Sequence, residues 1–527
     1  MEKIQLGRIF TDGMILQCEK PVKIWGSSQE KTELPILING TEIKRGCVDK
    51  GAFSFVLPPQ EAQENAVLQI GDLILRNVDF GEVFLAGGQS NMEFLLKYDV
   101  SLEKELEHAE DAHLRYYEVG KYQFLGEREE GIVSDPDWDC WKTGSRENIP
   151  QFSAVAWHFA KEMRKTLRIP VGIVSCNYGG TTASSWMDPE ELTGELAVYR
   201  TEYEEKTKNL DMEQYLKMNR MLRAGMASPE SKKMMSAILY GGEKLKAMMA
   251  EMQQSMKMQG EGQQNAGTPS SGTSEDAVQK GRAMMQMTGP HDKNRPGGLY
   301  ESMLSEVSGY GIRGVLWYQG ETDEIHPHIY AQLMGAMIRC WRRDWGEELP
   351  FFAVQLAPYG TWMGSNGEKF PILRRQQEIA AQTEKDVFLI SSSDVGDASD
   401  IHPKQKEPIG HRLALAVRSE IFGEPLQWKA PKLVQGEQVN GRLVLQFDHA
   451  DGMYVNGENV HALHIFADGN ELEIIGFEVQ GSELLLEIPE ICNGTKIDVE
   501  FACTGYYEVN LYNQAGIPAM PASISVR

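Results

Sequence analysis

The chain has 527 residues, of which 41% are hydrophobic and 24% charged, and its formal net charge is −24. This length exceeds a single compact core, so we expect roughly two to four domains in an ordinary soluble globular protein. The strong acidity argues against nucleic acid and against anionic membrane surfaces as partners, because both are bound by basic protein surfaces.

No stretch of the sequence has the pattern of a targeting or membrane segment. The first ten residues lack the apolar core of a signal peptide, and no later stretch approaches the ~18 apolar residues of a membrane helix. We therefore expect a cytoplasmic protein, with secretion left open if a leader has been removed.

The seven cysteines are dispersed along the chain, and no two of them have C-x-x-C spacing. An odd, scattered set indicates reduced, partly buried thiols rather than a disulfide framework. The same spacing excludes zinc fingers. His326 and His328 lie two residues apart around a proline, which fits no standard helical zinc motif, so we expect no metal site.

Short β-strands dominate the first part of the chain. The runs Val22–Gly26, Leu34–Leu37 and Phe53–Leu57 are apolar or alternate, and Gly, Pro and Asn residues separate them. We expect an N-terminal β-sandwich-like domain over residues 1–80.

Between residues 81 and 425, short apolar strands alternate with helical segments, which is typical of an α/β domain with a doubly wound parallel sheet. The expected strands are Val83–Ala86, Val171–Cys176, Gly314–Tyr318, Phe351–Leu356 and Val387–Ser391. The expected helices are Asn91–Tyr98, Gln151–Leu167, Pro371–Thr383 and Glu407–Ile421.

Residues 195–290 interrupt this alternation. They begin with Met-, Glu-, Lys- and Ala-rich sequence of high helix propensity, and Gln259–Glu275 is low-complexity. We expect a helical insertion whose low-complexity part is mobile.

From residue 426 to 527 the pattern is again that of strands. Leu443–Phe447, His461–Phe466 and Glu483–Ile488 alternate or are apolar between Gly and Asn turns. We expect a C-terminal β domain.

The sharpest local motif is Gly88-Gln89-Ser90-Asn91-Met92, directly after a predicted buried strand. A serine at a strand-to-helix turn lies at the carboxyl end of the sheet, where open α/β folds bind ligands. Backbone N–H groups that begin the helix would face an incoming oxyanion. Alone, the pattern fits a serine N-cap equally well, and Met92 stands where the Gly-x-Ser-x-Gly elbow requires its second glycine.

Three further segments follow strands of the same predicted sheet. Gly179-Gly180-Thr181 offers backbone amides, Gln319 offers a side-chain amide, and His402 in Asp400-Ile401-His402-Pro403 offers an imidazole. With the Ser90 hydroxyl, these groups form a complete set for acyl transfer at one sheet edge.

These blocks resemble those of the sialate O-acetylesterase family, a carbohydrate-esterase branch of the SGNH hydrolases. The likeness includes Trp317-Tyr318-Gln319-Gly320-Glu321, extends to Ile9–Gln17 and Asn510–Ala519, and covers most of the chain outside 195–290. It implies an SGNH-type wound sheet and a serine esterase that needs no cofactor. The implied substrate is a small acetylated sugar or oligosaccharide, with O-acetylated sialic acid foremost.

The resemblance also implies a role for individual residues. Ser90 would attack the acetyl carbonyl, and His402 would take its proton and return it to the sugar hydroxyl. The backbone amides of Ser90 and Gly180 and the side chain of Gln319 would form the oxyanion hole. The residues expected to shape the pocket without reacting are Glu321 and Trp186.

The acid that orients His402 is left open. Many SGNH enzymes have it three residues before the histidine, where this chain has Ser399. Asp400 is the nearest candidate, Asp397 and Asp394 are alternatives, and a backbone carbonyl could take the role.

Other functions stay open at this stage. An esterase for acetylated xylan or mannan fragments, a lipase or a thioesterase would use the same parts, and a non-catalytic carbohydrate-binding protein is the alternative of another class. A sialate site would offer a cation to the sugar carboxylate. Arg295 and Arg374 are candidates, although solvated surface is the more ordinary role for both. Association with further copies of the chain is also open.

Overall fold

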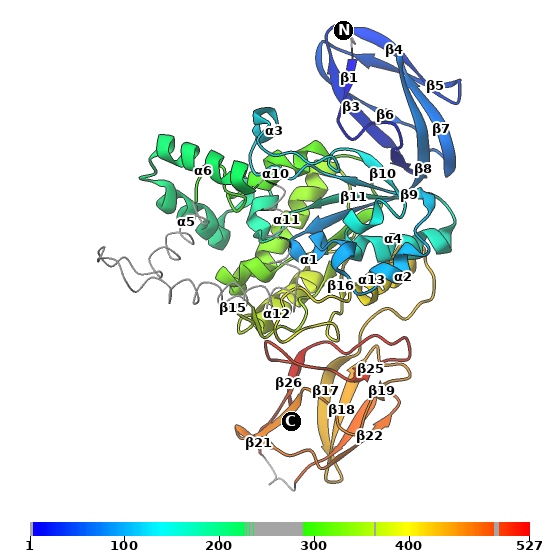
Figure 1. Ribbon diagram of the computed structural model, residues 1–527. Coiled ribbons are helices and arrows are strands. Elements are labelled where there is room, and N and C mark those ends of the chain that lie inside the picture. The colour runs from blue at the N-terminus through cyan, green and yellow to red at the C-terminus, as the bar shows by residue number, and fades with distance from the viewer. Residues whose placement is uncertain are drawn as a thin grey trace, which may run out of the picture. The chain divides into compact units, whose positions relative to one another are not determined.

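The computed structural model describes residues 4–226, 228, 231, 236, 288–362, 365–489 and 495–526. The chain is a mixed α/β protein with several sheets (Figure 1). It divides into one unit of residues 1–121, 137–183 and 304–527 and a second of residues 122–136 and 184–303. The predicted low-complexity stretch 259–275 lies outside the described residues.

Most strand pairs in the N-terminal part of the first unit are antiparallel, and β2 pairs with β8 in the parallel sense. One sheet has the order β1-β3-β6, and in a second β4 pairs with β5 and β7, while β7 pairs with β8. The three strands predicted here are confirmed within β3, β4 and β6. The bounds are β1 (Ile4–Leu6), β2 (Ile15–Gln17), β3 (Val22–Ser28), β4 (Thr32–Ile38), β5 (Thr41–Val48), β6 (Gly51–Leu57), β7 (Gln63–Ile70) and β8 (Leu73–Gly88).

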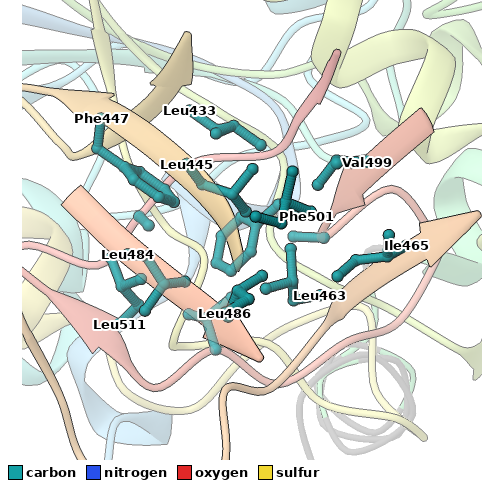
Figure 2. Packing of buried hydrophobic residues seen from close by; sticks show 14 of the residues in the cluster. Leu433, Leu445, Phe447, Leu463, Ile465, Leu484, Leu486, Val499, Phe501 and Leu511 are labelled. Carbon is teal, nitrogen blue, oxygen red and sulfur yellow. The ribbon is translucent and has the colours of Figure 1, made fainter. Parts of the chain in front are cut away.

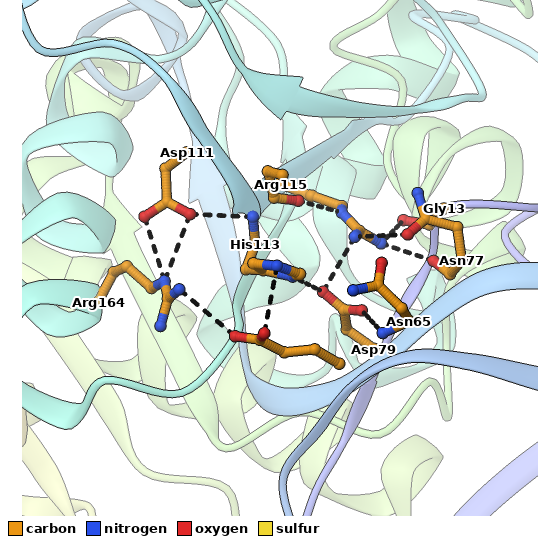
Figure 3. Close-up of polar contacts among 10 residues, drawn as sticks. Gly13, Asn65, Asn77, Asp79, Asp111, His113, Arg115 and Arg164 are labelled. Atoms are coloured by element: carbon orange, nitrogen blue, oxygen red, sulfur yellow. Dashed lines mark hydrogen bonds and ion pairs between the residues drawn. The ribbon is translucent and has the colours of Figure 1, made fainter.

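The long strand β8 takes part in both the N-terminal pairing and the central sheet, and a polar cluster lies where it passes between them (Figure 3). The fully buried Asp79 carboxylate accepts hydrogen bonds from Nδ1 of His113 at 2.7 Å and from the Asn65 amide at 2.7 Å. The Arg115 guanidinium lies 3.0 Å from it. A buried carboxylate needs such donors, so this cluster stabilises the passage of β8.

The central sheet has the order β10-β9-β11-β8-β12-β13-β16, and all neighbours from β9 to β16 are parallel. β10 pairs with β9 in the antiparallel sense. Four of the five strands expected within 81–425 are confirmed to within two residues at their ends, whereas the expected strand Val83–Ala86 is only the last part of β8, which begins ten residues earlier at Leu73. Beyond β8, the bounds are β9 (Asp111–Glu118), β10 (Trp141–Gly144), β11 (Val171–Asn177), β12 (Gly314–Tyr318), β13 (Phe351–Val354) and β16 (Val387–Ile390).

Four long helices belong to the same part of the chain as these parallel strands. α4 packs against α13 and β11, and α11 packs against α12. The sequence predicted three of these helices but not α11. The bounds are α4 (Ala154–Leu167), α11 (Tyr330–Trp345), α12 (Phe370–Thr383) and α13 (Glu407–Glu420).

The single helix predicted for Asn91–Tyr98 is wrong. The chain forms a four-residue helix, α1 (Ser90–Glu93), and then a 3₁₀ turn, η1 (Leu96–Tyr98). Phe94 leaves the helical region at ψ 112°, and its carbonyl accepts the Ala154 amide at 2.8 Å. This bond to a distant residue replaces the helical one, so a tertiary contact overrides local propensity.

The C-terminal strands form two four-stranded antiparallel sheets, β17-β18-β23-β22 and β21-β20-β24-β26. Buried side chains from both sheets, including Leu445, Leu484, Ile465 and Val499, make one hydrophobic cluster (Figure 2). The three strands predicted here are confirmed within a few residues. The main bounds are β17 (Lys432–Val439), β18 (Arg442–Asp448), β20 (Leu463–Ala467), β21 (Asn470–Leu472), β22 (Gly476–Gln480), β23 (Glu483–Glu487), β24 (Ile497–Phe501) and β26 (Ala522–Val526).

The described part of the second unit is helical, with α3 (Glu127–Glu130), α5 (Ala197–Thr207), α6 (Met212–Met226) and α10 (Gly298–Ser302). The buried Arg223 of α6 donates to the buried Glu127 carboxylate at 2.6 Å. Helices at 197–226 agree with the predicted helical character of this segment.

The helices and the cysteines bear on two predictions made from the sequence. Across the described ranges, no helix combines the length and apolarity that crossing a bilayer requires. The six cysteines that the structure describes, which leave out Cys492, are free thiols.

Candidate active site

The central strands end side by side, and this brings the predicted site segments to one sheet edge. Gly88 at the end of β8 is in register with Asn177 of β11 on one side and with Tyr318 of β12 on the other. Ser90 and Gln319 therefore follow neighbouring strand ends.

Glycine is required where β8 ends. Gly88 has a φ of +135°, and a Cβ atom there would lie 2.1 Å from the Tyr318 carbonyl oxygen. The next amide, that of Gln89, donates to the same carbonyl at 3.0 Å. The turn into α1 is thus held against β12, and Ser90 is the first residue of the helix.

The structure brings the Ser90 hydroxyl to His402, which lies 312 residues away in the sequence. Ser90 Oγ and His402 Nε2 are 2.9 Å apart, and both residues are buried. On the other side of the ring, His402 Nδ1 lies 3.5 Å from Oδ1 of Asp400. The same Oδ1 accepts the backbone amide of His402 at 2.8 Å. A hydroxyl, an imidazole and a carboxylate therefore lie in sequence, as in a serine hydrolase triad.

Burial sets the electrostatics of these groups. It lowers the pKa of His402, an effect opposed by Asp400 and reinforced by Lys406 and Lys404. The pKa of Asp400 is lowered despite its burial, because His402 and Lys404 hydrogen-bond to it. The half-buried Trp362 ring meets the imidazole edge-to-face, with centroids 5.1 Å apart. Burial thus favours the neutral form of His402, the form that can accept a proton.

The loop that carries Gly179 and Gly180 is attached to the serine helix. The Gly179 amide donates to Glu93 Oε2 at 2.6 Å, and a Cβ on Gly179 would lie 3.3 Å from the Cβ of Ser90. The other Glu93 oxygen lies 3.1 Å from Nζ of Lys121. Gly180 has a φ of +68°, which favours glycine. This loop thus lies next to Ser90, as predicted for the backbone oxyanion donors.

The Gln319 side chain is fully buried, and neighbouring groups determine its orientation. Its Nε2 donates to the Thr181 carbonyl at 3.0 Å and to Asp323 Oδ2 at 2.5 Å, while Oε1 accepts from Tyr330 at 2.8 Å. Both amide hydrogens are engaged, so an oxyanion role would require Gln319 to exchange one of these bonds.

Glu321, two residues after Gln319, is buried. Its Oε1 accepts from Asn91 Nδ2 at 2.6 Å, and burial raises its pKa. Asn91 also donates to the Ile401 carbonyl at 3.0 Å and accepts from Nζ of Lys406 at 2.6 Å. Burial lowers the pKa of Lys406 to about 7. Glu321 therefore belongs to a buried polar chain beside Ser90.

The structure also describes Trp186 and the alternative aspartates. Trp186 is the last residue of the 3₁₀ turn η3 (Ala183–Trp186), belongs to the second unit and is fully buried. Asp394 forms two hydrogen bonds with Arg412, at 2.8 and 2.7 Å, and Asp397 accepts from Ser399 at 2.7 Å. Asp400 is thus the aspartate in contact with the His402 ring.

The interpretation of Arg374 as solvated surface or as a sugar-carboxylate donor is wrong. The side chain is buried, and its guanidinium donates to the carbonyls of Leu356, Ala357, Thr504 and Gly505. A buried guanidinium needs acceptors for its hydrogens, and these bonds connect α12 to the loop after β24. Arg295 pairs with Glu301 within the second unit.

The sequence interpretation missed Asn91, Glu93 and Lys406. Asn91 lies within the serine motif and Glu93 comes directly after it, so the local sequence contained a signal for both. Lys406 lies four residues after His402 and resembles a surface lysine in sequence. Within the described ranges, no group of three or more His, Cys, Asp or Glu side chains is placed to hold a metal ion.

Comparisons with known proteins show which proteins this chain resembles. A family model described as "Carbohydrate esterase, sialic acid-specific acetylesterase" matches residues 279–419. The sialate O-acetylesterase of Mus musculus is 24% identical over 514 residues, which are 90% of this chain and 83% of that protein. The human sialate O-acetylesterase is 22% identical over 505 residues, covering 89% and 79%. A crystal structure of a carbohydrate acetylesterase from Xanthomonas citri superimposes with a TM-score of 0.70 at 25% identity, covering 99% of each chain.

Proposed function

We propose that this carboxylic ester hydrolase, a carbohydrate O-acetylesterase related to the sialate O-acetylesterases, uses Ser90 as its nucleophile and His402 as its general base. The observation that carries the residue assignment is the 2.9 Å contact between Ser90 Oγ and His402 Nε2. Asp400, 3.5 Å from Nδ1, is the orienting acid. The finer fold assignment, an SGNH-type doubly wound sheet, rests on the parallel order β9-β11-β8-β12-β13-β16.

The chemistry follows from the order of these groups. Ser90 Oγ attacks the acetyl carbonyl carbon while His402 Nε2 takes the hydroxyl proton. The imidazolium then returns this proton to the sugar oxygen as the ester bond breaks, which leaves an acetyl-serine. Water, deprotonated by His402, releases acetate and regenerates Ser90. Asp400 stabilises the imidazolium at both steps.

Backbone amides supply the oxyanion hole in this proposal. The amide of Ser90 begins α1, and that of Gly180 lies in the loop that Glu93 holds through Gly179. Each donor of this type contributes about 3 kcal/mol to the transition state. The side chain of Gln319 is the third proposed donor, and it takes this role by exchanging its bond to Thr181 or to Asp323 for one to the oxyanion.

The sugar is O-acetylated sialic acid in the leading form of the proposal, because the curated relatives are sialate O-acetylesterases. The buried position of Arg374 favours the runner-up, a neutral acetylated xylo- or manno-oligosaccharide, since this arginine has its hydrogens on backbone carbonyls. Acetyl transfer itself needs only a small acyl pocket, so the leaving sugar determines selectivity.

Acetate release tests both levels of the proposal. Aryl acetate should be hydrolysed faster than aryl butyrate or longer esters, and Ser90→Ala is the control. O-acetylated sialic acid and acetylated xylo- and manno-oligosaccharides are then compared at equal concentration. A preference above roughly tenfold for the neutral oligosaccharides would remove sialate and leave the esterase chemistry.

A further inference from the structure

Lys406 is an unusual residue to find beside a serine nucleophile. Its side chain is 1% exposed, and its ammonium lies 4.8 Å from the centre of the Phe94 ring and 5.5 Å from that of Tyr318. Its backbone amide donates to Asp99 Oδ2 at 2.8 Å. Burying an ammonium costs free energy, and hydrophobic residues of similar volume often stabilise a protein more. The position therefore calls for a functional reason.

The geometry of Asn91 supplies that reason. An ammonium can only donate, so the 2.6 Å contact with Lys406 requires that Oδ1 of Asn91 faces Nζ. The Nδ2 group is then directed the other way. It donates to the Ile401 carbonyl at 3.0 Å and to Glu321 Oε1 at 2.6 Å. Ile401 is the residue before His402, and Asn91 is the residue after Ser90.

We propose that Lys406 is a positioning residue, which orients Asn91 so that its amide holds the Ile401 carbonyl and thereby keeps His402 against Ser90. This inference rests on the proposed esterase function. The buried chain Lys406–Asn91–Glu321 ties the loop of His402 to the helix of Ser90 and to the turn after β12. Without these hydrogen bonds the imidazole shifts by about 1 Å, and a displacement of this size lowers kcat about 10²-fold.

Lys406 also acts on His402 through its charge. The charged groups that influence the imidazole are Asp400, Lys404 and Lys406, and those facing Lys406 are Glu321, Asp99, Lys404 and Asp400. A cation disfavours the imidazolium, so removing the Lys406 charge raises the pKa of His402. The base is active when neutral, and the acid limb of kcat/KM therefore moves to higher pH.

The first test is Lys406→Met, which keeps volume and removes the charge. We expect kcat on aryl acetate to fall about 10²-fold with KM within about twofold, the acid limb to move upward, and Tm to stay level or rise. Lys104→Met, which removes an exposed lysine paired with Glu407, is the matched control and should leave all four quantities unchanged. A wild-type kcat and pH profile, or a loss of kcat that only follows the unfolded fraction, would overturn the proposal.

Asn91 variants test the route of the effect. In Asn91→Asp the carboxylate keeps a partner for Lys406 but has no hydrogen for Ile401, so we expect a similar loss of kcat, and this variant also serves if Lys406→Met does not fold. The double variant Lys406→Met/Asn91→Leu should be no slower than Asn91→Leu, and losses that multiply would show that Lys406 acts independently.

Failure of the esterase proposal can be separated from failure of this one. If the wild-type enzyme and Ser90→Ala release acetate at the same rate, the proposed function is wrong. The positioning claim is then decided by a crystal structure of Lys406→Met. An Asn91 amide that remains on the Ile401 carbonyl contradicts the claim.

Discussion

The hydrophobic cluster of the C-terminal strands and the carboxyl edge of the central sheet bury different kinds of side chain. In the C-terminal cluster, two antiparallel sheets enclose Leu, Ile, Val and Phe side chains such as Leu445 and Phe501. At the sheet edge, the buried groups include Lys406, Glu321 and His402, all at most 6% exposed.

The physics of these two regions differs accordingly. Burial of apolar surface stabilises the fold without a specific partner. Burial of ionisable groups costs free energy that hydrogen bonds must offset, but it shifts pKa values and holds reacting groups in place. Substitutions should therefore separate stability from activity, the C-terminal cluster affecting the first and the sheet edge the second.

The largest expected effect is at Ser90. Ser90→Ala should lower kcat on aryl acetate by roughly 10⁶-fold with Tm unchanged, because the proposed nucleophile is lost while the packing stays. His402→Ala should cost about as much. The double variant should be only slightly slower, and additive losses measured in steady-state kinetics would contradict a dyad that acts as one unit.

Asp400→Asn should come next, with a loss of ~10⁴-fold in kcat. This change removes the carboxylate that accepts the His402 backbone amide and that we propose stabilises the imidazolium. Asp397→Asn is the matched control, since Asp397 accepts from Ser399 instead. If the kcat of Asp397→Asn is strongly reduced while that of Asp400→Asn stays near the wild-type value, Asp397 is the orienting acid instead.

Gln319→Leu tests whether a buried amide at the sheet edge contributes to catalysis. We expect kcat to fall by about 10²- to 10³-fold, as on loss of an oxyanion donor, with KM little changed. A variant with the wild-type kcat would restrict the role of Gln319 to its bonds with Thr181 and Asp323.

The C-terminal cluster should show the opposite behaviour. Leu445→Ala should lower the free energy of unfolding by about 2–5 kcal/mol, because a fully buried side chain leaves a cavity. The kcat of the folded enzyme at 25 °C should stay within about twofold. The exposed Gln446 on the same strand is the control, and Gln446→Ala should change stability by less than about 0.5 kcal/mol in denaturant melts. A large loss of kcat in Leu445→Ala would end the distinction between the two regions.

The smallest effect is in the pH profile of the wild-type enzyme. Burial lowers the pKa of His402, so the neutral base persists to lower pH than an exposed histidine allows. The half-maximum of kcat/KM on the acid side should therefore lie below about 6.5. A half-maximum above this value would show that Asp400 outweighs burial.

Sequence alone determined most of the strands and helices and singled out the serine and the histidine of the proposed site. Strands such as β12 and β6 were predicted to within two residues at their ends, because a short apolar or alternating run between turn residues has few other ways to fold. Ser90 and His402 were identified from local motifs at the predicted strand ends, and the structure places their polar atoms 2.9 Å apart.

Tertiary structure decided what those motifs touch. The roles argued for Asn91 and Lys406 depend on a contact across 315 residues, and the burial of Arg374 depends on carbonyls about 130 residues away. The break between α1 and η1 also comes from a distant strand-like contact, Leu95 with Ser153. Local pattern reports the preference of a segment for helix or strand. Which buried polar group finds which partner is determined only when the strands align, because each buried donor must be satisfied by whatever acceptor the fold brings within reach.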